Sequence, residues 1–286
     1  MTSEHANTAP PQQDNAPSKD GVVRHTVTIT RDEHLGARHA MTVRLALRTE
    51  RQRRRQRWTW IGDPDATARF RQRMFDALPY QPAPVPLAPR LLDEHDDGQV
   101  IRRRYRLRIN PDDETEAVLL LPRGASAARP VPGLLAIHES GGAFLWGKDK
   151  LYRSSDAPPP LRAMQQRVYA DGAPSGEFFA SRGFAVLAID QIGFGSRAIW
   201  QPEDEPYLQG EQPLDEASEW RIRLRMRYEQ TWLHRALLAS GVSESQISLH
   251  DNRRALDWFE QMPEVDDRRL GAYGHSVGAY QCHELA

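Results

Sequence analysis

Ser276 is the residue with the clearest capacity for chemistry in this sequence. It lies in the stretch Gly274-His275-Ser276-Val277-Gly278, which fits the pattern G-x-S-x-G between an apolar run and a helix-compatible segment. On a tight strand-to-helix turn the backbone is strained and the hydroxyl projects away from the sheet, while the flanking glycines avoid clashes with strand and helix. The pattern therefore predicts a nucleophilic serine. The alternative is a serine in an ordinary glycine-rich turn.

A nucleophilic serine needs donors for the negative charge that develops on a carbonyl oxygen. The segment HESGG at 138–142 follows another apolar run, and its glycine pair lets backbone amides face a ligand. We take the N–H of Ser140 as the best donor there, with Gly141 next, and the N–H of Val277 as the second donor. A plain turn without a ligand is the alternative for 138–142, and the serine motif favours the oxyanion hole.

Four other polar residues near these motifs are not expected to complete a catalytic triad. Asp190 opens the segment DQIGFGSR and is expected to brace its own loop by accepting backbone hydrogen bonds. His275 adjoins the serine, and adjacent side chains on this turn diverge. His283 and Glu284 lie about two helical turns beyond the serine, roughly 10 Å along the axis, and are expected to be surface residues.

The elements that would position these residues alternate between strands and helices. Continuous apolar runs, typical of strands covered on both faces, occupy 132–140, 184–190 and 268–276. Helical patterns occupy 176–183, 218–240 and 248–262. This alternation predicts an α/β fold with a parallel sheet and right-handed crossovers. Two further runs, 100–109 and 117–122, predict an antiparallel hairpin at one edge of that sheet.

The N-terminal third is organised differently. Residues 1–20 are polar and proline-rich, and we expect a disordered tail. The next patterns predict strands at 24–30 and 41–48, a helix at 63–80 with Asp63 as its N-cap, and a proline-rich connector without regular structure at 81–99. The expected domains are therefore the tail, an N-terminal extension with its connector at 21–90, and an α/β domain at 91–286.

Composition excludes several classes of function. The 286 residues carry a formal net charge of −1, which gives no general attraction to nucleic acid or anionic membranes. Five arginines at 51–57 could form a nucleic-acid patch, but no aromatic residues interleave them, and a solvated face is the preferred interpretation. No run is long enough for a membrane helix, no secretory signal is evident, and Cys282 is the single cysteine. We expect a cytoplasmic protein that binds neither nucleic acid nor membrane.

The stretch from about Leu91 to Ala286 resembles bacterial α/β-hydrolases related to acetyl xylan esterases and dienelactone hydrolases. The resemblance is carried by LLAIHESGGAFLWGKDK, FFASRGFAVLAIDQIGFGSRA and DNRRALDWFEQMPEVDDRRLGAYGHSVGAY. It implies an α/β-hydrolase fold, a serine nucleophile acting through an acyl-enzyme, and a small-molecule ester as substrate.

Three aromatic residues near the predicted rim of the site are candidates to contact the substrate: Phe144, Trp146 and Trp200. No metal-ligand spacing and no phosphate-binding glycine loop is found, and the Gly-x-Gly at 193–195 is too short for a dinucleotide fingerprint. We expect neither a metal nor a cofactor.

The sequence departs from this family after Ser276. In the fold that it resembles, the triad follows the order Ser, then Asp or Glu, then His, whereas ten residues follow Ser276 here. We therefore expect a C-terminally incomplete domain whose triad acid and histidine lie outside the sequence, and a chain that is inactive or nearly so by itself. The strand before Ser276 would then show an unpaired apolar edge that favours self-association. The alternatives are a non-catalytic binding or scaffold protein derived from a hydrolase, and one half of a split enzyme.

Overall fold

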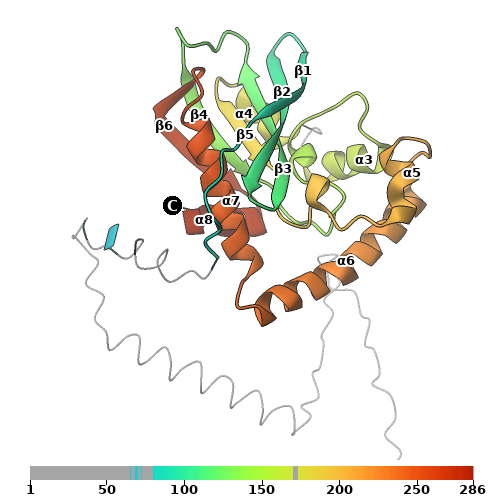
Figure 1. Ribbon diagram of the computed structural model, residues 1–286. Coiled ribbons are helices and arrows are strands. Elements are labelled where there is room, and N and C mark those ends of the chain that lie inside the picture. The colour runs from blue at the N-terminus through green and yellow to red at the C-terminus, as the bar shows by residue number, and fades with distance from the viewer. Residues whose placement is uncertain (1–64, 66–67, 70–71, 73–79, 170–172, 286) are drawn as a thin grey trace, which may run out of the picture. The chain divides into compact units, whose positions relative to one another are not determined.

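A computed structural model describes residues 65, 68–69, 72, 80–169 and 173–285 (Figure 1). The predicted tail, the strands at 24–30 and 41–48, and the basic run at 51–57 lie outside these residues. The four described positions of the predicted helix at 63–80 that precede Tyr80 are helical. By residue contacts the chain divides into the units Met1–Arg73 and Met74–Ala286, and the elements below belong to the second unit.

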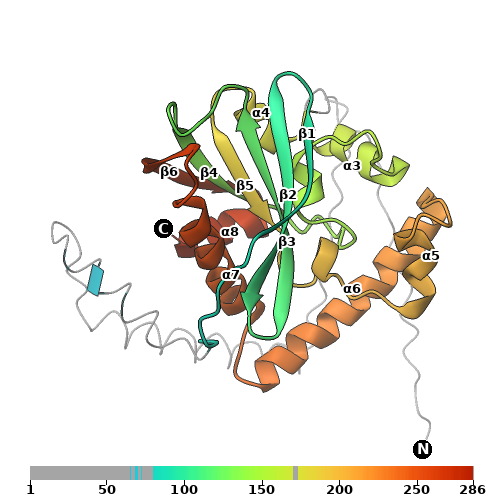
Figure 2. The same ribbon diagram turned by 45° about the horizontal axis from the view of Figure 1, so that its top comes forward.

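The centre of this unit is a mixed sheet of six strands in the order β1-β2-β3-β5-β4-β6 (Figure 2). The strands are β1 (Arg90–Asp96), β2 (Val100–Asn110), β3 (Asp113–Pro122), β4 (Val131–Ile137), β5 (Ala185–Ile189) and β6 (Val265–Gly274). Strands β1, β2 and β3 form an antiparallel meander, β3 pairs with β5 antiparallel, and β4 runs parallel to both β5 and β6. The strands predicted at 132–140, 184–190 and 268–276 and the two strands of the hairpin at 100–109 and 117–122 are thereby confirmed.

Strand β1 corrects the expectation that 81–99 is irregular and that the hairpin forms the sheet edge. The last proline of the connector is Pro89, so the residues after it are free to pair with β2. Their polar sequence is stabilised across the strands, since Asp93 accepts from Arg104 at 2.5 Å and Glu94 from Arg103 at 2.6 Å. Because these ion pairs with β2 stabilise β1, its own sequence, RLLDEHD, needs no apolar periodicity, which explains why the pattern did not indicate β1.

The helices cover both faces of the sheet. They are α3 (Pro159–Val168), α4 (Ser175–Ala180), α5 (Glu205–Leu208), α6 (Glu216–Ala239), α7 (Glu244–Phe259) and α8 (Val277–Leu285), with 3₁₀ turns η1 (Lys148–Leu151), η3 (Gly195–Arg197) and η4 (Pro202–Asp204). Helices α7 and α8 pack on one face around Phe259, and α4 with η1 packs on the other around Ala180 (Figures 1 and 2). Strand β5 is buried along its whole length between these layers, as its apolar run predicts.

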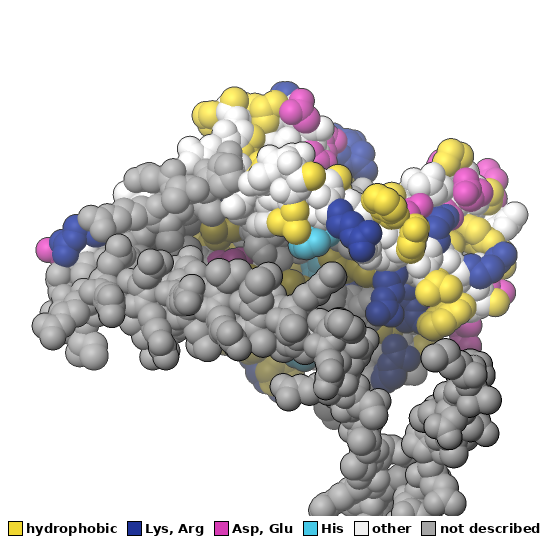
Figure 3. All heavy atoms as spheres, turned by 90° about the horizontal axis from the view of Figure 1, so that it is seen from below, with side chains coloured by type: hydrophobic (Ala, Val, Ile, Leu, Met, Phe, Trp, Pro, Cys, Tyr) yellow, Lys and Arg dark blue, Asp and Glu magenta, His cyan; other side chains and the backbone are white. Residues whose placement is uncertain are grey.

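Helix α6 confirms the helix that the pattern at 218–240 predicts. Asp215 caps its N-terminus by accepting from the N–H of Ser218 at 2.8 Å. Ile222 and Met226 are buried in a second apolar cluster with the 143–146 segment and α3. A second row on the helix is exposed, namely Trp220, Leu224, Tyr228 and Trp232. Seen from below, hydrophobic and basic side chains lie next to each other on the side where α6 runs (Figure 3).

Among the described residues, strand β6 forms one edge of the sheet and β1 forms the other. Nine of the ten residues of β6, Asp266–Gly274, are exposed or half-buried. Self-association through this edge stays a prediction. No helix in the described ranges is both long and apolar enough to cross a membrane.

Candidate functional site

Ser276 occupies a strained turn between β6 and α8. Its φ angle is +56°, in the left-handed region that non-glycine residues rarely adopt. The glycines on either side allow this turn, because a Cβ at Gly274 would overlap the backbone of Gly278, and one at Gly278 would overlap the carbonyl oxygen of Ile137. The Ser276 side chain is exposed at the tip of the turn. The backbone thus has the geometry expected of G-x-S-x-G between a strand and a helix.

The first turn of α8 presents its amides beside Ser276. The N–H of Gly278 donates to His275 O at 3.0 Å and that of Tyr280 to Ser276 O at 3.2 Å. The N–H of Val277 has no acceptor among the described residues, and neither does the Ser276 hydroxyl. A free amide at the positive end of a helix dipole is suited to hold an anionic oxygen.

The segment after β4, residues 138–147, is called here the β4 loop, and it emerges next to this turn. The register of the parallel strands pairs Ile137 with Gly274, so both segments leave the sheet at the same edge. Gly141 and Gly142 have φ angles of +52° and +68°, which supply the sharp change of direction. Within the described part of the chain, no acceptor meets the N–H groups of Ser140 and Gly141. The predicted donors therefore lie on neighbouring segments.

The segment after β5, residues 190–197, is called here the β5 loop, and Asp190 organises it. Its carboxylate accepts from the N–H of Lys148 at 2.8 Å and from the N–H of Ser196 at 2.9 Å. The Lys148 ammonium lies 3.1 Å from the same carboxylate. Asp190 is fully buried. The expectation that Asp190 braces its loop by accepting backbone hydrogen bonds is confirmed.

Two buried lysines of η1 were not predicted as part of the site. Lys148 lies 3.1 Å from Glu116 and 3.3 Å from Asp149, in addition to Asp190. Burial alone would lower the pKa of Lys148, but these carboxylates hold the pKa well above its usual range. Lys150 is equally buried and contacts the β4 loop instead. The sequence GKDK at 147–150 gave no signal for this burial, because a lysine beside an acid in sequence is normally solvated.

His138, at the start of the β4 loop, connects this loop with the β5 loop. Its Nε2 accepts from the N–H of Gln191 at 3.2 Å, so in the neutral ring Nδ1–H donates to Glu139 O at 3.1 Å. Burial, followed by the charge of Lys150, lowers the pKa of His138 to about 3. His138 is therefore a neutral structural residue at physiological pH.

A chain of buried amides supports the serine turn from behind. Gln191 Nε2 donates to Asn252 Oδ1 at 3.0 Å, and Asn252 Nδ2 donates to Gln281 Oε1 at 3.2 Å. These bonds join the β5 loop, α7 and α8. The sequence offered no signal for them, because the three residues are 61 and 29 positions apart.

The histidines nearest to Ser276 in sequence do not contact its hydroxyl. His275 and His283 are exposed, and Glu284 is half-buried on α8. In the ranges that the structure describes, no histidine or carboxylate hydrogen-bonds Ser276, and no group of three or more His, Cys, Asp or Glu side chains is arranged to hold a metal ion.

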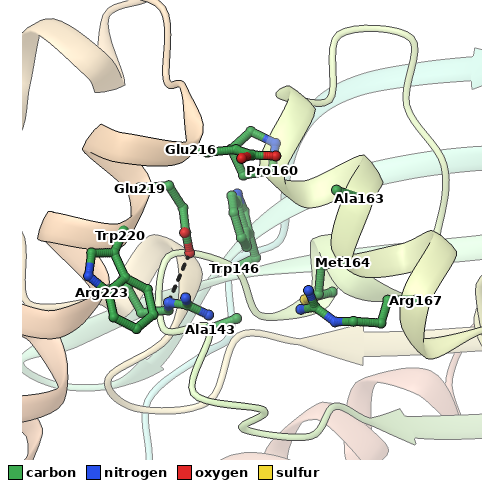
Figure 4. Close-up of a pocket in the computed structure, with 10 residues that line it drawn as sticks. All are labelled: Ala143, Trp146, Pro160, Ala163, Met164, Arg167, Glu216, Glu219, Trp220 and Arg223. Carbon is green, nitrogen blue, oxygen red and sulfur yellow. Dashed lines mark ion pairs between the residues drawn. The ribbon is translucent and has the colours of Figure 1, made fainter.

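The structure places the aromatic rim candidates inside the apolar cluster beneath α6. Phe144 and Trp146 are 8% and 7% exposed, and the rings of Phe144 and Phe194 are 5.2 Å apart. Trp200 packs against the cluster and donates from Nε1 to Gly195 O at 3.1 Å. Trp146 also lines a cavity of about 270 Å³ between α3 and α6, where Glu219 and Arg223 form an ion pair (Figure 4). Their contact with a substrate stays a prediction.

A second cavity, of about 260 Å³, adjoins the serine turn. Its lining residues come from the end of β4, η1, α3, α4 and the end of β6, and they include Glu139, Tyr169, Ser175, Tyr273 and His275. Tyr273 donates to Ser175 Oγ at 3.4 Å, and burial raises the pKa of Tyr273 to about 12. Its hydroxyl is thus protonated at neutral pH. The sequence analysis missed these residues, although Tyr273 lies three positions before the serine.

Comparison with known proteins agrees with this fold. The structure is similar to a "putative acetyl xylan esterase" from Bacteroides fragilis NCTC 9343, with a TM-score of 0.54 and 17% identity over 78% of this chain and 50% of that one. A glucuronoyl esterase from Solibacter usitatus aligns with a TM-score of 0.44 and 17% identity, over 79% of this chain and 56% of the other. The "Putative hydrolase YtaP" of Bacillus subtilis (strain 168) is 23% identical over 211 residues, which are 74% of this chain and 56% of that protein. No protein-family model matches the chain.

The chain thus spans about half the length of the proteins that it matches. The described part of this chain therefore has an α/β-hydrolase fold, related to that of the acetyl xylan esterase structure.

Proposed function

We propose that this chain carries the nucleophile and the oxyanion donors of a serine ester hydrolase. The observation that carries the proposal is the backbone of Ser276, held at a φ angle of +56° between two glycines that cannot accept a Cβ. Such strain persists only where the surrounding structure imposes it, and it concentrates at functional sites. Here it presents the hydroxyl beside free amides from α8 and the β4 loop.

The proposed reaction follows from these positions. Ser276 Oγ attacks the ester carbonyl carbon and gives its proton to a base, while the N–H groups of Val277 and of Ser140 or Gly141 hold the oxyanion. The bond from this carbon to the alcohol oxygen then breaks, and the alcohol leaves with the proton from the base. Water attacks the acyl-enzyme in the same way, which releases the carboxylic acid and restores the hydroxyl.

The base is not among the histidines described above, since neither His275 nor His283 contacts Ser276. We therefore place the proton acceptor and its acidic partner outside the described residues. The expectation that the chain by itself is nearly inactive stays a prediction. A binding protein derived from a hydrolase stays the alternative function.

We further propose small acyl groups, such as acetyl, as the acid part of the substrate. The cavity of about 260 Å³ beside Gly274 and the β4 loop has room for a group of this size. The B. fragilis neighbour is named a "putative acetyl xylan esterase", which supports the same class.

The test is hydrolysis of p-nitrophenyl acetate by the chain and by its Ser276→Ala variant. Oxyanion donors and binding alone give roughly 10³-fold catalysis over water when triad members are missing, and this part of the rate does not need the Ser276 hydroxyl. We expect faster hydrolysis with the wild-type chain than with Ser276→Ala, which should keep only this residual rate.

Ser243→Ala is the matched control, because Ser243 caps α7 far from the turn in sequence. It should retain the wild-type rate. Equal rates with and without the Ser276 hydroxyl would contradict the proposed hydrolase and favour the binding protein.

A further inference from the structure

The two buried lysines of η1 have opposite surroundings. Lys148 lies within 3.3 Å of three carboxylates. Lys150 forms no ion pair with any described residue; its ammonium donates to Glu139 O at 2.7 Å and to Ser140 O at 3.1 Å, and lies 4.9 Å from the centre of the Phe194 ring. A fully buried ammonium without a carboxylate is costly, so its contacts call for an explanation.

The geometry of the peptide group supplies that explanation. In a planar trans peptide, the C=O and the N–H point in opposite directions. The carbonyl of Glu139 shares its peptide plane with the N–H of Ser140, and the carbonyl of Ser140 shares its plane with the N–H of Gly141. Because Lys150 draws both carbonyls toward itself, both N–H groups point away from it, and no described residue accepts them.

The β4 loop needs such an external contact. Gly141 and Gly142 both have positive φ angles, and glycine adopts left- and right-handed conformations with similar ease. The N–H of Ala143 donates to Ser140 O at 2.9 Å and His138 Nδ1–H donates to Glu139 O at 3.1 Å, so each carbonyl has one donor within the loop. Among the described residues, Lys150 is the donor that binds both carbonyls and thereby fixes the two peptide groups relative to each other. The hydrogen bonds to the ammonium are charge-assisted and stronger than neutral ones.

We propose that Lys150 is a positioning residue, whose ammonium holds the carbonyls of Glu139 and Ser140 and thereby turns the N–H groups of Ser140 and Gly141 outward as oxyanion donors. The orientation of the two peptides stands on the contacts above, and its use in catalysis rests on the proposed function of Ser276. Lys150 does not touch the substrate in this arrangement.

The charge of Lys150 makes the arrangement sensitive to pH. Burial lowers the pKa of Lys150 to about 8, against the opposing effect of nearby acids. The titratable groups that face it are Glu139 and His138 from the β4 loop, Asp190 from the β5 loop and Asp149 from η1. Above pH 8 the ammonium loses its charge, and its hold on the two carbonyls weakens.

Nuclear magnetic resonance can observe this hold directly. Labelling serine carbonyls with ¹³C and glycine nitrogens with ¹⁵N gives one cross-peak for each Ser-Gly pair in the sequence, and these pairs are Ser140–Gly141, Ser175–Gly176 and Ser240–Gly241. The last two serve as internal controls. A Ser140→Ala variant assigns the first.

We expect the Ser140–Gly141 cross-peak to move with a midpoint near pH 8, while both control peaks stay in place. In Lys150→Met the movement should be lost. A cross-peak of the wild-type chain that stays in place through pH 8, or one that still moves in Lys150→Met, would overturn the proposal. If Lys150→Met does not fold, the wild-type titration alone decides.

Hydrolysis gives a second readout, which separates this inference from the proposed function. Lys150→Met should lower kcat for p-nitrophenyl acetate about 10²-fold, as the loss of an oxyanion donor does, and should leave KM within about threefold. An unchanged kcat would overturn the catalytic use of Lys150. Hydrolysis that does not depend on Ser276, together with a titrating cross-peak, would instead refute only the proposed function.

Discussion

The β4 loop and the β5 loop are each held by a buried charged side chain that hydrogen-bonds the backbone, and the two charges have opposite sign. Both follow buried strands, both contain glycines with positive φ angles, and both close around a fully buried charged group. In the β5 loop the carboxylate of Asp190 accepts two backbone N–H groups. In the β4 loop the ammonium of Lys150 binds two backbone carbonyls.

The sign of the buried charge decides whether the backbone N–H groups or the backbone C=O groups of the loop stay free to hydrogen-bond a ligand. The buried acid Asp190 accepts from one N–H of the β5 loop, that of Ser196, and most other N–H groups of this loop donate to backbone carbonyls or to His138, so the loop serves as structure. A buried base consumes carbonyls, so the β4 loop keeps its amides free for an anionic oxygen. A buried positive charge thus leaves a loop whose N–H groups can bind an anionic oxygen, and a buried negative charge leaves a loop with a structural role.

The largest expected effect comes from removing the acid of the β5 loop. Asp190→Asn removes the fully buried one of the three carboxylates around Lys148 and the charged acceptor of two backbone N–H groups, and breaking a buried pair of this kind costs about 3–5 kcal/mol of unfolding free energy. Lys150→Met should change this free energy by less than about 2 kcal/mol, because the cost of burying an ammonium and the loss of its hydrogen bonds offset each other. Urea unfolding at pH 7 compares the two variants. Equal losses would contradict the assignment of different roles to the two loops.

Two glycine substitutions test the same difference between the loops, with a smaller expected effect on stability. Gly195 of the β5 loop has a φ angle of +55°, and a Cβ there would lie 2.5 Å from Asp190 Oδ1. Gly142 of the β4 loop has a φ angle of +68° with open space around it. Gly195→Ala should cost about 3 kcal/mol from strain and overlap, and Gly142→Ala about 1 kcal/mol from strain alone. Thermal unfolding of both variants measures the difference in stability. A larger loss of stability in Gly142→Ala than in Gly195→Ala would contradict the conclusion that the β5 loop is packed and the β4 loop is open.

The smallest effect concerns His138, which connects the two loops. Its folded pKa of about 3 lies below the unfolded value near 6.5, so the unfolded state binds more protons in between and stability falls as pH falls below 6.5. From pH 6.5 to 5 the loss should be about 2 kcal/mol. His138→Gln keeps polar contacts but cannot take up this proton, so its urea midpoint should fall less over the same interval. Parallel pH dependence in both proteins would show that His138 does not carry the effect.

Local sequence patterns predicted most of the fold, because their causes are local. The continuous apolar runs at 132–140 and 184–190 became the buried strands β4 and β5, and G-x-S-x-G predicted the turn at Ser276. Strand β1 escaped prediction, because its stability comes from ion pairs with another strand, as between Glu94 and Arg103.

The charged interior of the site escaped prediction for the same physical reason. Lys148 is buried through Glu116 and Asp190, which lie 32 and 42 positions away along the chain. A lysine beside an acid in sequence is normally a solvated residue, and nothing local distinguishes the exception. The free amides of the β4 loop could be anticipated from its glycines, but the group that orients them could not.

The contact between α8 and β4 has a consequence for motion. At Gly278 the helix backbone lies against the carbonyl groups of Ile137 and His138, so closely that no side chain fits between them. Ile137 ends β4, and the β4 loop begins at the next residue. When thermal fluctuations displace the first turn of α8, the start of the β4 loop is displaced with it. The separation between the Ser276 hydroxyl and the amides of that loop should therefore fluctuate less than the position of either one.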